Sequence, residues 1–288
     1  MARWTRPRYR TKASVAYNRN MKPRTLILRT AGTNCDKETA HAFELAGAET
    51  QAVHINQLLA EPGLIDNYQL MAIPGGFSYG DDIAAGKILA NQINHHLRDA
   101  FRAFVAAGKP IIGVCNGFQV LVKTDLLPGP LGDRTGQTAT LAHNDSGRFM
   151  DQWVHLLPQP GRCIWTKDLP PLLELPIAHG EGRFVPADER VRQGLHANQQ
   201  VALVYAQADG LSAGGVAPAN PNGSVDDIAG ICDATGLVFG LMPHPERYVS
   251  PLQHFAWTRQ KHRPDVAIGL RIFQNAVTHV RETLGAGV

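Results

Sequence analysis

The 288-residue sequence is poor in cysteine and contains no recognisable metal-binding motif. Its four cysteines lie far apart and form no C-x-x-C pair, which argues against a zinc knuckle and a dithiol redox motif, so we expect reduced thiols. Twelve histidines are present, but none forms H-E-x-x-H. We therefore expect no metal site in this chain.

Long apolar runs are also missing. No stretch approaches the ~20 apolar residues of a membrane helix, and residues 1–20 lack the apolar centre of a secretory signal. With 44% apolar and 18% charged residues, the chain is long enough to bury a substantial core. We expect a cytoplasmic globular protein without membrane contact.

Acidic residues are absent from the first 24 positions, which hold eight of the 28 lysines and arginines. Without these eight, 20 basic residues face 25 acidic ones, so the net charge of +3 hides a body of charge −5. We interpret residues 1–23 as a basic extension, more in keeping with a disordered or upstream segment before Met21 than with a targeting or nucleic-acid arm. Residues 24–288 are predicted to form one domain that binds no nucleic acid.

Within this domain, short apolar runs alternate with amphipathic stretches, which predicts an α/β fold with a mixed, mostly parallel sheet flanked by helices. The second half has a more antiparallel pattern. The first half predicts strands at 25–30, 50–55, 70–76 and 110–114 and helices at 36–48, 87–108 and 118–124, and the second half predicts strands at 152–157, 200–206, 228–233 and 237–243 and a helix at 265–285.

The stretch "GVCNGFQ" places Cys115 between two glycines, directly after a predicted strand. This spacing is typical of a nucleophile elbow, in which small neighbours permit a sharp turn that displays the side chain. A helix N-terminus behind the thiol would favour the thiolate. The alternative is a buried cysteine that merely packs beside two glycines, and a base elsewhere in the chain would decide between them.

A cysteine that attacks a carbonyl group also needs hydrogen-bond donors for the developing oxyanion. "IPGGFSYGDD" offers the backbone N–H groups of Gly75 and Gly76, and Asn116 offers the N–H directly after the thiol. The G-x-x-x-x-G spacing also suggests a phosphate loop. Asp81 and Asp82 argue against that alternative, because they stand where Lys-Ser/Thr is needed and would repel phosphate.

Two His-x-Glu triplets could supply the base, His179 with Glu181 and His244 with Glu246. In extended backbone, residues i and i+2 face the same side, so either glutamate could orient its imidazole. His244 follows an apolar run and has a proline on each side, which predicts a stiff strand end. His179 lies in a glycine-rich stretch and favours an adaptable loop.

With "GVCNGFQ" and "MPHPE", the sequence resembles the class I (triad) glutamine amidotransferases, which have a flavodoxin-like α/β domain. "RTAGTNCD", "PGGFSYGDD", "CNGFQVL", "LLPGPL", "AHGEGRF", "PNGS", "IAGICD" and "GLMPHPER", in this order, narrow the resemblance to the glutaminase subunits of phosphoribosylformylglycinamidine synthases. The resemblance spans roughly residues 24–282.

The resemblance implies that Cys115 is the nucleophile, His244 the general base and acid, and Glu246 the residue that orients His244. It further implies an oxyanion hole at Gly75, Gly76 and Asn116. Substrate-binding roles are implied for Phe77, Gln119 and His179.

The activity implied is hydrolysis of L-glutamine through a cysteine thioester, with ammonia passing to a large synthase subunit of purine biosynthesis. An additional small subunit is left open. The chain shows no nucleotide motif, so no cofactor is expected on it, and ATP and Mg²⁺ are expected on the partner. Two alternatives remain, a stand-alone cysteine hydrolase of γ-glutamyl substrates and a noncatalytic regulatory subunit on the same fold.

Three regions depart from the short bacterial pattern that the resemblance implies, namely the basic extension, residues 131–147 and residues 249–265. We expect none of them to touch a catalytic residue, so the departures concern the details of partner docking and not the chemistry.

Overall fold

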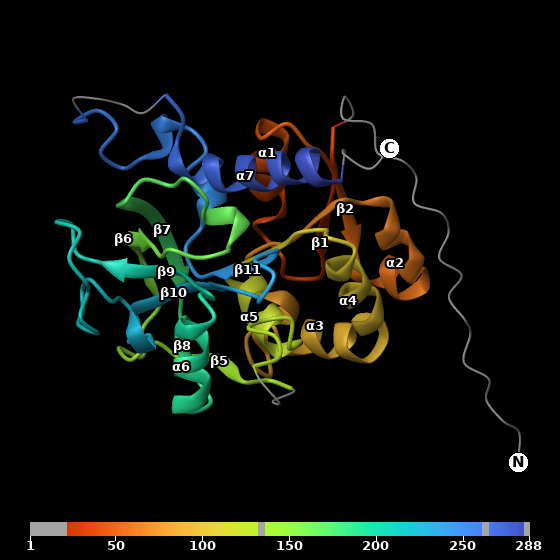
Figure 1. The fold of residues 1–288 in the computed structure, drawn as a ribbon, viewed down its shortest axis with the longest axis horizontal. Coiled ribbons are helices and arrows are strands. Elements are labelled where there is room, and N and C mark those ends of the chain that lie inside the picture. The colour runs from red at the N-terminus through yellow and green to blue at the C-terminus, as the bar shows by residue number, and fades with distance from the viewer. Residues whose placement is uncertain (1–21, 132–135, 261–264, 285–288) are drawn as a thin grey trace, which may run out of the picture.

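The computed structural model describes residues 22–131, 136–260 and 265–284 (Figure 1). Except for its last two positions, the predicted extension 1–23 lies outside the described residues. The described chain forms one nine-stranded sheet and one two-stranded sheet. The strands are β1 (Arg24–Arg29), β2 (Glu49–His54), β3 (Leu70–Ile73), β4 (Ile111–Val114), β5 (Ala139–Ala142), β6 (Met150–Pro158), β7 (Leu173–His179), β8 (Arg183–Pro186), β9 (Val201–Ala206), β10 (Ile228–Cys232) and β11 (Val238–Leu241). The helices are α1 (Asp36–Leu45), α2 (Ile55–Ala60), α3 (Lys87–Gln92), α4 (Arg98–Ala106), α5 (Asn116–Lys123), α6 (Glu189–Ala197) and α7 (Ile268–Thr283).

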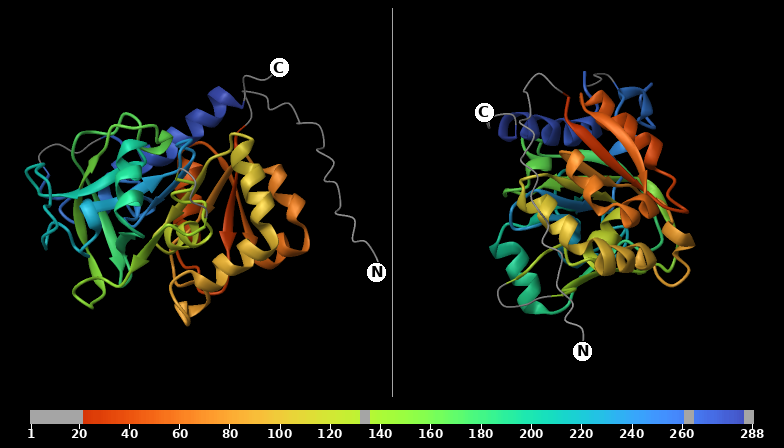
Figure 2. Two further views of the ribbon diagram at one scale, coloured as in Figure 1. Left: turned by 60° about the horizontal axis from the view of Figure 1, so that its bottom comes forward. Right: turned by 90° about the vertical axis from the view of Figure 1, so that its right-hand side faces the viewer.

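The large sheet has the order β2-β1-β3-β4-β11-β10-β9-β6-β7. Its first five strands pair in parallel, and the pairs from β11 to β7 are antiparallel. Figure 2 shows these two parts at opposite ends of the molecule. The predicted mixed α/β sheet, with an antiparallel second half, is therefore confirmed, and the order β2-β1-β3-β4 is that of flavodoxin-like folds.

The three strands β3, β4 and β11 are buried along their whole length. Continuous apolar runs are expected of parallel strands covered on both faces by helices. Their carboxyl ends lie at one edge of the sheet, where ligands bind in open α/β folds. The loops after these strands contain Gly75, Cys115 and His244.

Helices cover both faces of the sheet (Figure 1). Helix α1 packs against α7 on one face, and α3 packs against α5 on the other. The right-handed crossovers of parallel strands account for this division, since β1 connects to β2 on one side and β3 to β4 on the other.

The predicted helix 87–108 is interrupted by a π-helical stretch, Ile93–Leu97, between α3 and α4. The wider turn keeps both Ile93 and Leu97 in the core, and Asn94 donates from Nδ2 to the Lys123 carbonyl over 3.0 Å. The apolar residues recur through this stretch at helical spacing, so the sequence pattern gives no sign of the π-helical turn. The predicted long helix is therefore present, with the π-helical stretch at its centre.

Five short elements were not predicted, namely α2, β5, β7, β8 and α6. β5 and β8 form the small sheet by pairing across some 40 residues of sequence, so neither segment carries a strong local signal. α6 has a local signal that was overlooked, because Asp188 accepts the N–H of Val191 as an N-cap.

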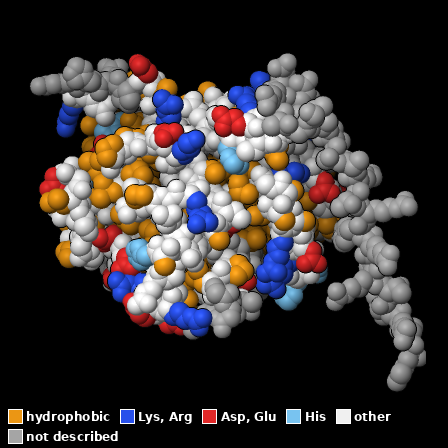
Figure 3. All heavy atoms as spheres, viewed as in Figure 1, with side chains coloured by type: hydrophobic (Ala, Val, Ile, Leu, Met, Phe, Trp, Pro, Cys, Tyr) orange, Lys and Arg blue, Asp and Glu red, His pale blue; other side chains and the backbone are white. Residues whose placement is uncertain are grey.

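Among the described residues, no helix combines the length and the apolar character needed to cross a membrane. On the face shown in Figure 3, basic and acidic side chains are interspersed, and hydrophobic side chains gather over β6 and β9.

Candidate active site

Cys115 stands between the end of β4 and the first residue of α5, with φ 51° and ψ −105°. Residues other than glycine rarely adopt a positive φ, so the predicted sharp turn is present and strained. Both flanking glycines are required by close packing. A Cβ on Gly113 would lie 2.6 Å from the Gly117 carbonyl oxygen, and one on Gly117 would collide with the carbonyl of Ile73 at the end of β3.

His244 follows β11, which pairs in parallel with β4. Leu241 at the end of β11 lies opposite Val114 at the end of β4. The backbone N–H of His244 donates to the Pro176 carbonyl over 2.8 Å, which fixes the strand end against β7. Nδ1 of His244 lies 2.6 Å from Oε1 of Glu246, and both side chains are buried. The rigid His-x-Glu pair expected from the sequence is thus formed.

Gly75 shows how closely the thiol and the imidazole approach. A Cβ on Gly75 would lie 2.9 Å from His244 Cε1 and 3.5 Å from Cys115 Cβ, so both side chains border the same small space. Nε2 of His244 is buried and has no hydrogen-bond partner among the described residues. It is therefore available to exchange a proton.

The surroundings favour the charged form of this imidazole. Burial would by itself lower the pKa of His244, because water no longer stabilises the charge. The carboxylate of Glu246, followed by the thiols of Cys115 and Cys35, outweighs burial, and the pKa is raised well above its usual value of 6.5. An imidazolium beside Cys115 is the arrangement that stabilises a thiolate.

The loop after β3 contains Gly75 and Gly76, the residues whose N–H groups the sequence analysis expects to face an oxyanion. Gly76 has φ 139°, and a Cβ there would lie 2.7 Å from the Asn34 nitrogen, so only glycine fits. The Gly75 carbonyl accepts the N–H groups of Asn34 and Cys35. Asn116 is the first residue of α5, a position whose N–H has no partner within a helix.

The Asn116 side chain has a contact that the sequence did not indicate. Its Oδ1 accepts the N–H of Ser78 over 3.2 Å, and its Nδ2 donates to Asp81 and Gln119. Asn116 therefore ties the loop after β3 to the helix that directly follows Cys115.

The three expected substrate-binding residues differ in their settings. Gln119 is buried, and its Nε2 donates to the Glu181 carbonyl over 2.6 Å. Sγ of Cys115 lies 3.7 Å from the carbonyl of Ala178, three residues earlier in the chain than Glu181. Phe77 is 47% exposed and lies 6.5 Å, centroid to centroid, from the ring of Phe149.

The prediction of an adaptable loop at His179 is wrong. This residue ends β7 and is buried, and its Nδ1 lies 3.1 Å from Asn144 Oδ1. Burial, followed by the positive charge of His244, lowers the pKa of His179 to about 3, so the ring stays neutral near pH 7. Strand pairing with β6 fixes this segment, and the glycines after it do not loosen it.

Asn144 is a residue that the sequence analysis missed. Its Oδ1 also accepts the N–H of Gly182, and its Nδ2 donates to the His179 carbonyl. Segment 131–147 therefore reaches an expected substrate-binding residue, although it touches none of the triad positions through these contacts. No local pattern could have revealed this, because the partners are separated by 35 residues.

Cys35 was missed as well, although its place could have been inferred. It follows β1, and loops after parallel strands meet at one edge of the sheet. Its thiol accepts a hydrogen bond from Nη2 of Arg247 over 3.2 Å.

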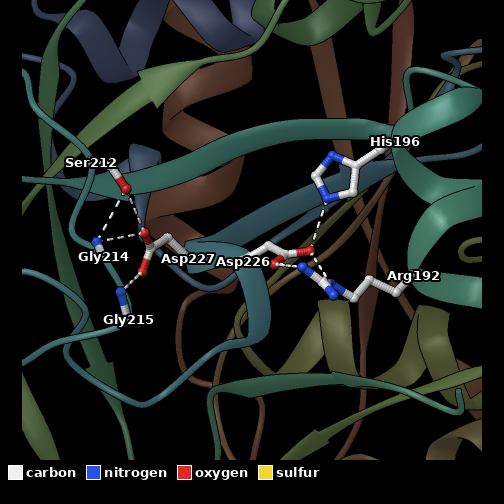
Figure 4. Close-up of a pocket in the computed structure, with 7 residues that line it drawn as sticks. All are labelled: Arg192, His196, Ser212, Gly214, Gly215, Asp226 and Asp227. Carbon is white, nitrogen blue, oxygen red and sulfur yellow. Dashed lines mark hydrogen bonds and ion pairs between the residues drawn. The ribbon is translucent and has the colours of Figure 1, made fainter. Parts of the chain in front are cut away.

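A second polar site lies apart from these residues, in a pocket of about 640 Å³ between α6 and the loops around β10 (Figure 4). Asp226 accepts from Arg192 and His196, and Asp227 accepts from the Gly214 and Gly215 N–H groups. These contacts satisfy the carboxylates internally, and the pocket includes none of the expected site residues.

Comparison with known proteins agrees with this geometry. A family model described as a CobB/CobQ-like glutamine amidotransferase domain matches residues 22–280. The phosphoribosylformylglycinamidine synthase subunit PurQ of Dehalococcoides mccartyi is 47% identical over 91% of this chain and 99% of its own length. The PurQ subunit of Treponema denticola is 48% identical over 80% of this chain and 89% of its own length. In the solved structure of PurLQS from Thermotoga maritima, a chain matches with a TM-score of 0.67 and 32% identity over 90% of this chain and 100% of that one.

Proposed function

The chain belongs to the family of glutamine amidotransferases that includes the PurQ subunits of phosphoribosylformylglycinamidine synthase. We propose that it is the glutaminase subunit of such a synthase. The observation that carries the proposal is the strained turn that presents Cys115 beside the buried His244–Glu246 pair. A noncatalytic subunit would have no need of this arrangement.

The proposed reaction begins with attack of the Cys115 thiolate on the carboxamide carbon of L-glutamine. The carbonyl π electrons move to oxygen, where the N–H groups of Gly76 and Asn116, with Gly75 shaping the loop, stabilise the oxyanion. The His244 imidazolium gives its proton to the leaving nitrogen, so the C–N bond breaks and ammonia departs. A γ-glutamyl thioester remains on Cys115.

Hydrolysis reverses the direction of proton transfer. Neutral His244 accepts a proton from water, and the hydroxide attacks the thioester carbon. The C–S bond breaks, glutamate leaves, and the thiolate–imidazolium pair is restored. Glu246 holds the imidazole through Nδ1 and stabilises its positive charge in both halves of the reaction.

We place the use of the ammonia on a separate large synthase subunit, with or without an additional small subunit. That partner would hold ATP and Mg²⁺ and would make formylglycinamidine ribonucleotide in purine biosynthesis. The matched T. maritima chain belongs to a structure of PurLQS, which supports an assembly of this kind. The four free thiols support a reducing, cytoplasmic setting.

A thioester-trapping experiment tests the proposed chemistry. The chain is mixed with glutamine, quenched in acid within one turnover, digested and examined by mass spectrometry. We expect one glutamyl group on the peptide that contains Cys115 and none on peptides with Cys163 or Cys232. Glutamate formation without any modified Cys115 peptide would overturn the mechanism.

A further inference from the structure

Asn144 has a side-chain amide whose orientation is fixed by backbone partners. Its Nδ2 donates to the carbonyl oxygens of His179 and Arg148, each over 2.9 Å, and a carbonyl oxygen can only accept. Its Oδ1 accepts the N–H of Gly182 over 3.0 Å, and a backbone N–H can only donate. The amide therefore cannot be turned around, and Oδ1 is the atom that faces the ring of His179.

This orientation determines which nitrogen of His179 carries the proton. Nδ1 lies 3.1 Å from Oδ1 of Asn144, and because an amide oxygen only accepts, Nδ1 must be the donor. Burial, followed by the charge of His244, lowers the pKa of His179 to about 3, so the ring is neutral near pH 7. A neutral imidazole with its proton on Nδ1 has a lone pair on Nε2. The contacts of Asn144 thus select one tautomer of His179.

The lone pair on Nε2 meets no donor of the protein itself. Nε2 of His179 is buried and has no hydrogen-bond partner among the described residues. A buried acceptor without a donor costs free energy, so such a group calls for an explanation. The ring is also held firmly, since a Cβ on Gly182 would collide with it and only glycine leaves room. The unpaired acceptor is therefore kept in one place.

His179 lies beside the proposed reacting groups. It ends β7, and the carbonyl oxygen of the preceding residue, Ala178, lies 3.7 Å from Sγ of Cys115. Among the described residues, His244 is the titratable group whose charge contributes to the pKa of His179. In the proposed reaction, the carboxamide carbon of glutamine meets Cys115 and its nitrogen takes a proton from His244. The substrate therefore brings an N–H donor to the neighbourhood of His179.

We propose that Asn144 is a positioning residue of the glutaminase, which holds His179 so that its Nε2 lone pair accepts a hydrogen bond from the carboxamide N–H of glutamine. The inference rests on the proposed function and gives His179 a defined contact with that substrate. The chemistry is complementary, because a carboxamide nitrogen carries N–H donors. A neutral ring also suits the place, since a second positive charge would oppose the imidazolium of His244. Nε2 has no proton to give, so the ring cannot protonate the departing ammonia.

The tautomer is measured first, by nuclear magnetic resonance of full-length wild-type protein labelled with nitrogen-15 in its histidines. The chemical shift of each ring nitrogen shows whether it carries a proton. We expect one ring with a protonated Nδ1 and an unprotonated Nε2 that stays neutral down to pH 5 and is missing from His179→Gln. This measurement needs no Asn144 variant, and a proton on Nε2 of His179 would overturn the proposal.

Kinetics then test what the lone pair binds. Wild type, Asn144→Ala, Asn144→Asp and the control Asn275→Asp are assayed with L-glutamine and with the γ-methyl ester of L-glutamate, whose leaving group has no N–H. Asn275 is a matched control, because its Nδ2 likewise donates to two carbonyl oxygens, those of Trp165 and Lys167, which are no part of the proposed site.

Asn144→Ala should raise KM for glutamine about ten-fold, the worth of one hydrogen bond, with little change in kcat or in KM for the ester. In Asn144→Asp a carboxylate would face Nδ1 and raise the pKa of His179, so Nε2 would gain a proton as pH falls. The KM of this variant for glutamine, relative to wild type, should therefore rise about ten-fold between pH 8.5 and pH 6. Asn275→Asp should follow wild type in every assay.

Two kinetic outcomes would overturn the proposal. One is an equal rise of KM for glutamine and for the ester in Asn144→Ala, because Nε2 would then not meet the carboxamide N–H. The other is a relative KM of Asn144→Asp that does not depend on pH. Failure of the proposed function is recognised separately, since wild type would then hydrolyse neither substrate, and the contact of His179 with glutamine would fall with it.

Discussion

The backbone N–H of Cys115 donates a hydrogen bond to the Leu241 carbonyl over 2.8 Å. This bond continues the parallel pairing of β4 with β11 by one residue beyond the strand ends. It joins the strand that presents the thiol to the strand that leads into His244. The relative position of the proposed nucleophile and base is therefore set by the sheet and does not depend on a flexible loop.

Removing the histidine of one His-x-Glu triplet should affect catalysis differently from removing the histidine of the other. His244→Ala should lower kcat by on the order of 10² to 10⁴, because the proton donor and acceptor is lost. His179→Ala should chiefly raise KM, because this ring lies beside the expected glutamine pocket and its partner is Asn144. Single-turnover acylation distinguishes them, and acylation that survives His244→Ala but vanishes in His179→Ala would reverse the assignment.

The turn around Cys115 should not tolerate a side chain at Gly117. A Cβ there collides with the Ile73 carbonyl, so Gly117→Ala should destabilise the fold by about 1–3 kcal/mol or more. Gly63→Ala is the matched control, since nothing lies within 4 Å of a Cβ at that position. Urea denaturation of both variants gives the comparison, and equal midpoints would contradict the packing described for β3 and α5.

Acid should destabilise the protein through His179. The pKa of this buried ring is lowered to about 3, so its contribution to stability is fully present above pH 6.5 and is lost as pH falls towards 3. The loss between pH 7.5 and pH 5 should be about 2 kcal/mol, because the unfolded chain takes up the proton and the folded chain does not.

His244 acts with the opposite sign, since its raised pKa favours the folded state more as pH falls. The contribution of His179 must therefore be measured by difference. His179→Gln should become less sensitive to acid than wild type, while exposed His96→Gln should follow wild type. Melting temperatures at several pH values check this, and parallel curves for all three proteins would refute it.

The isolated chain should hydrolyse glutamine slowly, and a synthase partner should raise the rate. Ammonia released into water is protonated and lost as a nucleophile, so uncontrolled hydrolysis wastes glutamine. The Asn116 side chain holds Ser78 and Asp81 of the oxyanion loop, so movement of this loop would withdraw a donor. Loss of one donor costs about 3 kcal/mol, or roughly 10² to 10³ in rate. Titration of partner while glutamate is measured tests the idea, and full turnover by the chain alone would contradict it.

The sequence was informative where a function depends on neighbours in the chain. The glycines around Cys115 and the two-residue spacing of His244 and Glu246 predicted a turn and a pair that the structure contains. Asn144 was missed because its partner His179 lies 35 residues away in the sequence. Cys35 was missed although its position after a parallel strand places it at the same edge of the sheet. His179 was predicted in an adaptable loop because glycines follow it in the sequence. Its backbone is instead fixed by the pairing of β7 with β6, a tertiary contact that the local sequence does not show.

The central claim is that this chain supplies ammonia from glutamine and that a partner uses it. The most direct measurement compares wild type with Cys115→Ala in the reconstituted synthase complex, with either glutamine or ammonium as the nitrogen source. We expect Cys115→Ala to abolish synthesis from glutamine and to leave synthesis from ammonium at the wild-type rate, because only the thioester step is lost. Equal loss of both activities, or full synthesis from glutamine by Cys115→Ala, would contradict the claim.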